Sequence, residues 1–344
     1  MDLTTHYMGL QLKNPIVASA SPLSADLGNI RHLEDSGAAA IVLPSIFEEQ
    51  IEANMLRETL SAVGVENSPA AAGYLPKANE RKPQQYLDLI RRAVDAVDIP
   101  VIGSLNGTTE EGWISYAKLI EEAGATSLEL NVYFIPTDIS LTGRDVEQRY
   151  LEILRAVRKA VDIPIAIKLG PYFSSMGHVA MQFVNAGADA LVLFNRFYQP
   201  DVDLTERRLL NDLQLSKAIE IGVPLLWIAV LSGRIDASLA ASTGVENSEQ
   251  ILKYLLAGAD VVMTTSALLR NGPYYVKELL AGTVSWLSAR DIESVGQIRG
   301  LLSQRNFRNP DSFGRANYMK ILQGYEYTRS GTGNLMPGRT KGAS

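Results

Sequence analysis

The chain has 344 residues, of which 46% are hydrophobic and 20% charged, an ordinary balance for a folded globular protein. It contains no cysteine, which excludes disulfide bonds, a thiol nucleophile and an iron–sulfur cluster held by this chain. The formal net charge is −6, with Lys and Arg interspersed among the acids, and this argues against a nucleic-acid partner.

The first residues lack the pattern of a secretory signal peptide, because Asp2, His6 and Lys13 interrupt the apolar positions. The longest apolar run, 224–231, is far shorter than the roughly 20 residues that a membrane-spanning helix needs. We therefore expect a cytoplasmic protein without a membrane segment.

In chain order, the first predicted element is a hairpin over residues 3–17 with its turn at Gly9, which we expect to close the bottom of the fold. Apolar runs between helical patterns then indicate the strands of a buried parallel sheet. These strands are predicted at 15–20, 40–44, 100–105, 127–131, 164–168, 190–195, 237–242 and 260–264.

Two short phrases recur between these elements. One places a glycine after a helical pattern, at Gly37, Gly124, Gly187 and Gly258, where only glycine takes the left-handed conformation without cost. The other is Val-Asp-Ile-Pro, ending at Pro100 and Pro164.

The spacing of these phrases indicates the architecture. Pro100 and Pro164 are 64 residues apart and Gly124 and Gly187 are 63 apart, which fits two units of a barrel that spends about 31 residues per unit. The sequence thus predicts an α/β fold, a (β/α)8 TIM barrel, with a doubly wound sheet as the alternative.

Long connections follow the second, fourth and sixth strands, at 45–84, 132–143 and 196–225. In a barrel these connections lie over the catalytic mouth. We expect one barrel domain over residues 1–327 and a mobile, Gly-, Arg- and Ser-rich tail over 328–344.

Barrel enzymes place their chemistry at the carboxyl ends of the strands. The last two strands end in Thr243 and Gly244, and in Thr265 and Ser266, each pair before a helix start. Backbone N–H groups and helix N-termini there commonly bind phosphate, so these residues predict a phosphate site. Ordinary helix capping by Ser and Thr is the alternative.

Lys168 ends an apolar strand, and a lysine is rarely buried without a partner. It can form a Schiff base, provide a fixed positive charge beside an electron-rich cofactor ring, or form a salt bridge. Asn131 and Asn195 end two further strands and can read the edge of an imide or a flavin, unless they only form turns. The three histidines fall at no strand end, and no metal-ligand cluster is present.

Taken together, these segments resemble the soluble class 1 dihydroorotate dehydrogenases and the flavin barrel of dihydropyrimidine dehydrogenase. The resemblance covers residues 10–280, and its specificity lies in the shared order of motifs over eight strands. The motifs are NPIVASASP at 14–22, LELN at 128–131, IKLGPYF at 167–173, GADALVLFN at 187–195, ASTGV at 241–245 and TTSALLRNGP at 264–273.

The resemblance implies flavin mononucleotide (FMN) as cofactor, and oxidation or reduction of a carbon–carbon bond in a pyrimidine-like ring through flavin N5. It places Asn131 and Asn195 at the substrate and Lys168 at the flavin. We also expect Arg196 to bind the substrate and Lys168 to take part in catalysis. The cofactor residues that it implies are Ser19, Ala20, Ser21, Ser45, Asn131, Lys168, Thr243, Gly244, Thr265 and Ser266.

Several positions depart from the family pattern. Phe134 stands where the family has its catalytic Cys or Ser, and Pro136 replaces a substrate-binding Asn. Pro44 replaces a flavin-contacting lysine, and Arg196 stands where the family usually has Ser or Thr. Tyr133, next to the lost position, is a candidate proton donor or else a packing residue, and an Arg196 facing the site can pair with a carboxylate.

The chain shows no Gly-rich nicotinamide-binding motif, so reoxidation requires a soluble acceptor or an electron-transfer partner subunit. The resemblance suggests a homodimer. Two other functions stay open: a phosphate-binding barrel lyase or isomerase that uses Lys168 as an imine former, and a non-catalytic flavin-binding homologue.

Overall fold

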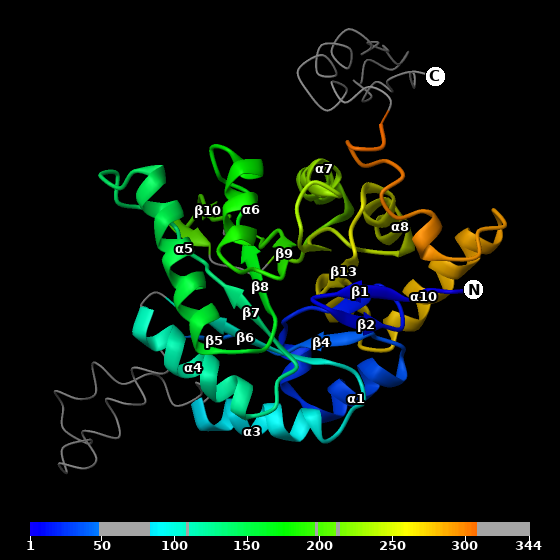
Figure 1. Cartoon of the computed structure of the whole chain (residues 1–344), viewed down its shortest axis with the longest axis horizontal. Helices are drawn as coiled ribbons and strands as arrows, with labels where there is room; N and C mark the ends of the chain where they lie inside the picture. The colour runs from blue at the N-terminus through cyan, green and yellow to red at the C-terminus, as the bar shows by residue number, and fades with distance from the viewer. Residues whose placement is uncertain (48–82, 108–109, 197–198, 211–213, 308–344) are drawn as a thin grey trace, which may run out of the picture.

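The structure is a computed structural model, which describes residues 1–47, 83–107, 110–196, 199–210 and 214–307 (Figure 1). Eight parallel strands form a barrel, which closes where β13 pairs with β3 and β4 pairs with β6. The predicted TIM barrel is therefore confirmed, and the doubly wound alternative is wrong. The strands are β3 (Ile16–Ala18), β4 (Ala40–Val42), β6 (Val101–Asn106), β7 (Ser127–Asn131), β8 (Ile165–Leu169), β9 (Ala190–Leu193), β12 (Ser238–Ala241) and β13 (Val261–Thr264).

Helices surround the barrel and cover its outer face (Figure 1). A short strand β5 (Ile46–Phe47) continues beyond β4 along the end of β6. The helices are α1 (Leu27–Asp35), α3 (Pro83–Val94), α4 (Glu110–Glu122), α5 (Gly143–Ala160), α6 (Met176–Asn185), α7 (Gly222–Leu231), α8 (Ser248–Ala257), α9 (Ser266–Asn271) and α10 (Tyr275–Ser288). Single 3-10 turns occur at η1 (Pro22–Ala25), η3 (Ala218–Ile221) and η4 (Val295–Gln297).

The repeated phrases correspond to repeated local structure. All four predicted glycines have positive φ angles, and at Gly258, with φ +116°, a Cβ atom would lie 2.0 Å from the Ser232 Oγ. The Val-Asp-Ile-Pro turns are held by a carboxylate from a neighbouring helix. Glu34 accepts hydrogen bonds from the N–H groups of residues 98–99, and Glu121 does so from residues 162–163.

The barrel interior is filled from below. The predicted N-terminal hairpin is present as β1 (Thr5–Tyr7) and β2 (Leu10–Leu12), and its residues Tyr7, Met8 and Leu12 are buried against the inward-facing side chains of the strands. A larger apolar cluster fills the space between the strands and the helices. The hairpin thus plugs the lower end of the barrel in the described part of the chain.

The three long connections differ in content. Of the first, residues 48–82 lie outside the described part of the chain. The second is irregular until Thr142 caps α5. The third contains an antiparallel hairpin of β10 (Asp201–Asp203) and β11 (Arg208–Leu210), then η3, and α7 begins at Gly222, four residues earlier than predicted.

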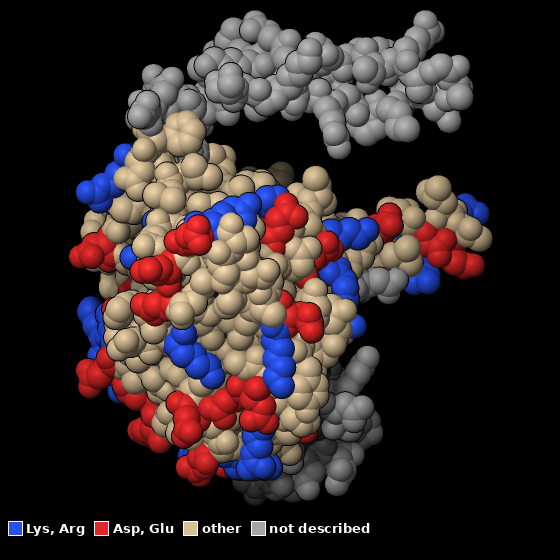
Figure 2. Space-filling model, turned by 90° about the vertical axis from the view of Figure 1, so that its right-hand side faces the viewer, with Lys and Arg blue, Asp and Glu red and all other residues tan. Residues whose placement is uncertain are grey.

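The surface carries both signs of charge. On the face that Figure 2 shows, Lys and Arg side chains are interspersed with Asp and Glu. Within the described ranges, no helix is both long enough and apolar enough to cross a bilayer. The predicted tail, 328–344, lies outside the described residues.

Candidate functional site

Two adjoining cavities open at the carboxyl ends of the barrel strands. The first has a volume of about 250 Å³ and the second of about 500 Å³. The second value lies within the range of small-molecule sites, roughly 300–1,000 Å³, and the first lies slightly below it. The residues common to both cavities are Ala20, Ser21, Pro22, Lys168 and Asn195. Lys168 therefore lies at the junction of the two spaces.

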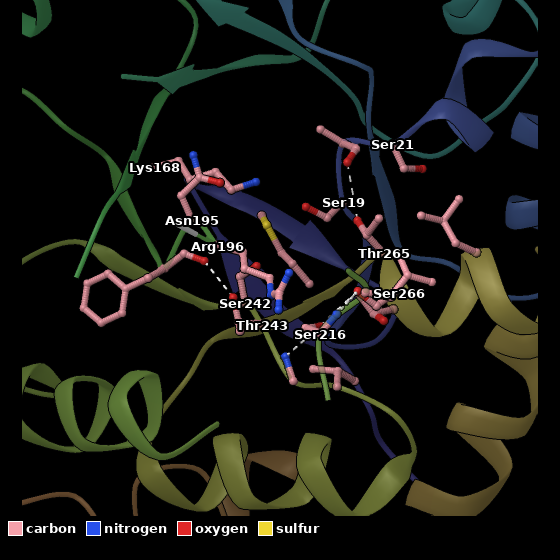
Figure 3. A pocket seen from close by; sticks show the side chains of 18 of the residues that line it. Ser19, Ser21, Lys168, Asn195, Arg196, Ser216, Ser242, Thr243, Thr265 and Ser266 are labelled. Carbon is pink, nitrogen blue, oxygen red and sulfur yellow. Dashed lines mark hydrogen bonds between the residues drawn. The ribbon is translucent and has the colours of Figure 1, made fainter. Parts of the chain in front are cut away.

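The first cavity contains the predicted phosphate-binding residues. Thr243 and Gly244 reach it from the loop after β12, and Thr265 and Ser266 from the loop after β13 (Figure 3). The predicted flavin residues Ser19, Ala20 and Ser21 line it from the loop after β3. The structure thus brings these residues together around one cavity.

Ser216 completes this group of polar residues. Its Oγ lies 2.9 Å from the Ser266 Oγ and accepts a hydrogen bond from the Gly244 N–H at 3.2 Å. Sequence reasoning missed Ser216, because its segment is far from any strand end, and the only available signal was the length of the connection after β9.

Helix N-termini contribute less to the predicted phosphate site than the sequence indicates. Ser266 opens α9, but α8 begins only at Ser248, where Asn247 caps it. Gly244, with φ +75°, therefore belongs to a loop rather than to the first turn of a helix. The Thr243 hydroxyl donates to the Phe194 carbonyl, so it stabilises the loop rather than pointing freely into the cavity.

The first cavity fits an anionic group with several acceptor oxygens. Among the described residues that line it there is no Asp or Glu, whereas hydroxyl groups are frequent. The buried Thr264 hydroxyl has no hydrogen-bond partner within the described part of the chain. A buried polar group without a partner is costly, so a ligand acceptor at this position would stabilise the site.

Lys168 forms a buried ion pair. Its Nζ lies 3.3 Å from the Glu129 Oε1, and the two residues are 7% and 0% exposed. The other Glu129 oxygen has no partner among the described residues. A carboxylate at this distance stabilises an ammonium ion, which suits a fixed positive charge better than an imine-forming amine.

Tyr7 lies within electrostatic range of the pair from below. Burial raises the pKa of Tyr7 well above its ordinary value, and the negative charges of Glu129 and Asp260 raise it further. The phenol is therefore neutral at physiological pH, and its hydroxyl has no partner within the described ranges. The buried groups close to Glu129 thus include this neutral phenol.

The second cavity is lined by a row of hydrogen-bonded amides and hydroxyls. The Asn195 amide donates to the Asn131 Oδ1 at 2.6 Å, and the Asn131 amide donates to the Ser45 Oγ at 3.4 Å. The Ser45 Oγ lies 2.8 Å from the Ser104 Oγ, and the Tyr86 hydroxyl donates to the Ser104 carbonyl. The row fixes the orientation of both asparagines, which can then offer donors and acceptors to a cyclic ligand.

Phe134 is held away from both cavities. It packs against the core, the Arg149 guanidinium lies 4.7 Å from its ring centroid, and its backbone N–H donates a hydrogen bond to the Tyr150 hydroxyl. Burial raises the pKa of Tyr150 to about 12 despite this bond. Tyr133 is half-buried and lines neither cavity, whereas Pro44 lines the second cavity in place of the expected lysine.

Arg196 lines the first cavity and not the second. Its Nε donates to the Glu220 carboxylate at 2.9 Å, and its Nη1 donates to the Gln214 carbonyl. The sequence prediction that Arg196 reaches the ligand site is consistent with this position, but its immediate neighbours are Ser216 and the loops after β12 and β13 (Figure 3).

Comparisons with known proteins show which proteins the chain resembles. The family model described as dihydroorotate dehydrogenase matches residues 2–287. The catalytic subunit of dihydroorotate dehydrogenase B (NAD(+)) from Methanocaldococcus jannaschii is 25% identical over 297 residues, covering 84% of this chain and 95% of that protein. The corresponding subunit from Shouchella clausii is 24% identical over 311 residues, covering 85% and 95%. The NAD-dependent dihydropyrimidine dehydrogenase subunit PreA of Escherichia coli K12 is 23% identical over 334 residues, covering 87% and 76%.

Proposed function

The chain belongs to the dihydroorotate dehydrogenase family, and from this premise we propose that it is an FMN-dependent dehydrogenase. Its reaction is oxidation or reduction of a carbon–carbon bond in a small cyclic substrate that resembles dihydroorotate or a dihydropyrimidine. The names of the relatives support this class of reaction.

One observation carries the proposal: the hydroxyl-rich first cavity and the amide-lined second cavity meet at Lys168. This arrangement suits a phosphate in the first cavity, a flavin ring against Lys168, and the substrate ring in the second. The residues that would hold FMN are Ser19, Ala20, Ser21, Ser45, Asn131, Lys168, Thr243, Gly244, Thr265 and Ser266. When bound, FMN supplies a hydride acceptor or donor.

The chain itself supplies position and charge. Asn131 and Asn195, fixed by their mutual hydrogen bond, orient the substrate ring, and orientation is a large part of the rate enhancement. Lys168, held by Glu129, keeps a positive charge where the two cavities meet. Such a preorganised charge stabilises negative charge that develops beside it.

Two hydroxyls are candidates for the second proton transfer. Tyr133, the candidate from sequence, is on the connection after β7 and lines neither cavity. Ser45 lines the second cavity and receives a hydrogen bond from Asn131, which stabilises negative charge on its oxygen. The position of Ser45 favours it over Tyr133.

Reoxidation requires a partner in this proposal. Two of the relatives are catalytic subunits of NAD(+)-linked enzymes, and this chain has no nicotinamide-binding motif of its own. We therefore expect an electron-transfer subunit or a soluble acceptor. A homodimer stays a prediction from the family resemblance.

The specific observation that favours a second function is the loss of the usual proton-transfer position, now Phe134, together with Pro44 and Pro136. These changes favour a flavin-binding homologue without catalysis. The lyase or isomerase alternative receives less support, because Lys168 is paired with a carboxylate.

A visible absorption spectrum tests the proposal. The purified protein should be yellow, release FMN on denaturation, and bleach anaerobically with dihydroorotate or 5,6-dihydrouracil. A colourless protein that FMN cannot reconstitute would rule the function out. Bound FMN that no member of a panel of dihydropyrimidines and cyclic acids reduces, and that oxidised pyrimidines do not reoxidise, would favour the non-catalytic homologue.

A further inference from the structure

We propose that Arg196 supplies the positive charge of the phosphate site and so makes the chain select a phosphorylated flavin over riboflavin. This inference rests on the proposed function, which places a phosphate in the first cavity. It replaces the sequence-based assignment of Arg196 to a substrate carboxylate.

The first argument is location. Arg196 shares the first cavity with Ser216, Gly244 and Ser266, and it is absent from the residues that line the second cavity. In Figure 3 its side chain extends from beside Asn195 toward Ser216 and Ser266. A group bound between the loops after β12 and β13 is therefore nearer to Arg196 than a substrate beside Asn131 is.

The second argument is charge. A phosphate monoester carries about −1.5 to −2 charges at neutral pH. Among the described residues that line the first cavity, the charged ones are Lys168 and Arg196. Lys168 lies where the first cavity meets the second, whereas Arg196 lines the first cavity and not the second, so Arg196 is the cation that this cavity can direct to a phosphate. Its planar fork of N–H donors matches phosphate oxygens.

The third argument is preorganisation. The Glu220 carboxylate binds the Arg196 Nε at 2.9 Å and also accepts a hydrogen bond from the Lys217 N–H at 2.7 Å, yet Glu220 does not line the cavity. The Gln214 carbonyl binds Nη1. The guanidinium is thus fixed by two partners, which lowers the entropy cost of using it on a ligand.

Arg270 provides a matched control. Its guanidinium donates hydrogen bonds to the segment that carries Ser216, to the Leu215 carbonyl at 3.1 Å and to the Ser216 carbonyl at 2.7 Å. It also pairs with Glu246 at 3.6 Å, and it does not line the cavity. Loss of Arg270 loosens the same segment without removing a charge from the cavity.

The test is a set of binding titrations on flavin-free protein. FMN, riboflavin and inorganic phosphate are titrated into the wild type, Arg196→Met, Arg196→Lys and Arg270→Met. We expect Arg196→Met to raise the Kd for FMN and for phosphate about tenfold or more, with riboflavin nearly unchanged. Arg196→Lys should recover part of the loss, and Arg270→Met should change the two flavins by similar factors.

Equal weakening of FMN and riboflavin by Arg196→Met, or no weakening of either, would overturn the proposal. A wild type that binds phosphate but no flavin, with Arg196→Met weakening the phosphate, would keep Arg196 at a phosphate site and remove the flavin function. A wild type that binds neither phosphate nor FMN would overturn both. Partial recovery by Arg196→Lys separates lost charge from misfolding.

Discussion

At the residue scale, the Glu129–Lys168 pair is the most exacting feature of the site. Both side chains are nearly inaccessible to water, so each depends on the other for compensation of its charge. Removal of one partner of a buried ion pair typically costs several times more than replacement of both.

We therefore predict that Glu129→Gln and Lys168→Met each lower the free energy of unfolding by about 3 to 5 kcal/mol. The double variant should lose clearly less than the sum of the two. Urea unfolding of the flavin-free protein measures all three values, and strictly additive losses would contradict the pairing.

Ser45 and Tyr133 are the two candidate proton-transfer residues, and we expect their substitutions to have different effects on the rate of flavin reduction. Because Ser45 lines the second cavity, Ser45→Ala should slow anaerobic flavin reduction by about 100-fold, a usual value for loss of an acid–base group. Tyr133→Phe should change the rate little. Stopped-flow absorbance gives both rates, and FMN titration checks that binding is retained; a large effect of Tyr133→Phe alone would reverse the assignment.

The polar residues at the strand ends could be predicted from sequence. An apolar strand pattern followed by polar residues indicates that those residues lie at the carboxyl end of the barrel. Thr243, Gly244, Thr265 and Ser266 were located in this way and do lie together. Ser216 and Ser104 could not be, since their roles depend on contacts between segments far apart in the chain. Which cavity Arg196 faces depends on Glu220 for the same reason.

At the element scale, acidic residues hold the amino ends of the strands. Asp260 accepts a hydrogen bond from the Leu239 N–H at 2.8 Å and pairs with Arg299. Burial raises the pKa of Asp260 above its ordinary value of 3.8, although both partners oppose the rise. The folded state therefore binds a proton at Asp260 more readily than the unfolded state does.

The raised pKa of Asp260 sets the sign of the pH dependence of stability. The contribution of Asp260 to stability should be fully present at low pH and decline as the pH rises through its folded-state pKa. The difference in unfolding free energy, wild type minus Asp260→Asn, should thus increase as the pH falls from about 7 to about 4. Urea unfolding at several pH values measures it; a difference that is flat or falls with acidification would refute the prediction.

The glycine after α8 illustrates how tightly the helices meet. A Cβ atom at Gly258 would lie 2.0 Å from the Ser232 Oγ, and the backbone there has φ +116°. Gly258→Ala should lower stability by about 1 to 3 kcal/mol through backbone strain alone, with the clash in addition. Gly9→Ala is the control, since Gly9 also has a positive φ but no atom within 4 Å of its Cβ position. Thermal unfolding should show the larger loss at Gly258.

At the scale of the whole molecule, the alternation of two phrases was sufficient to predict the barrel. The Gly-Ala and Val-Asp-Ile-Pro phrases both mark connections from a helix to the next strand, and their spacing sets the length of a repeating unit. The β10–β11 hairpin was not predicted, because its residues are mostly exposed and show no alternation of buried and exposed positions. Much of the connection after β4 falls outside the described residues.

The proposed domain boundary gives a prediction at this scale. All the barrel strands and helices lie before residue 289, so removal of residues 328–344 should leave thermal stability and FMN binding unchanged. Truncation after residue 300 should destabilise the protein, because it removes the Leu302 N–H bond to Leu256 and the Gln304 N–H bond to Ala229. Equal stability of the two truncations would show that the boundary is misplaced.

The closure of the barrel has a consequence for biosynthesis. β3 pairs with β13, so residue 16 waits for residue 262 to leave the ribosome before its ladder is complete. At about 5 to 20 residues per second, the delay is on the order of 10 to 50 seconds. During that interval the apolar residues of the β1–β2 hairpin cannot pack inside a closed barrel, so the hairpin is a segment that chaperones can bind.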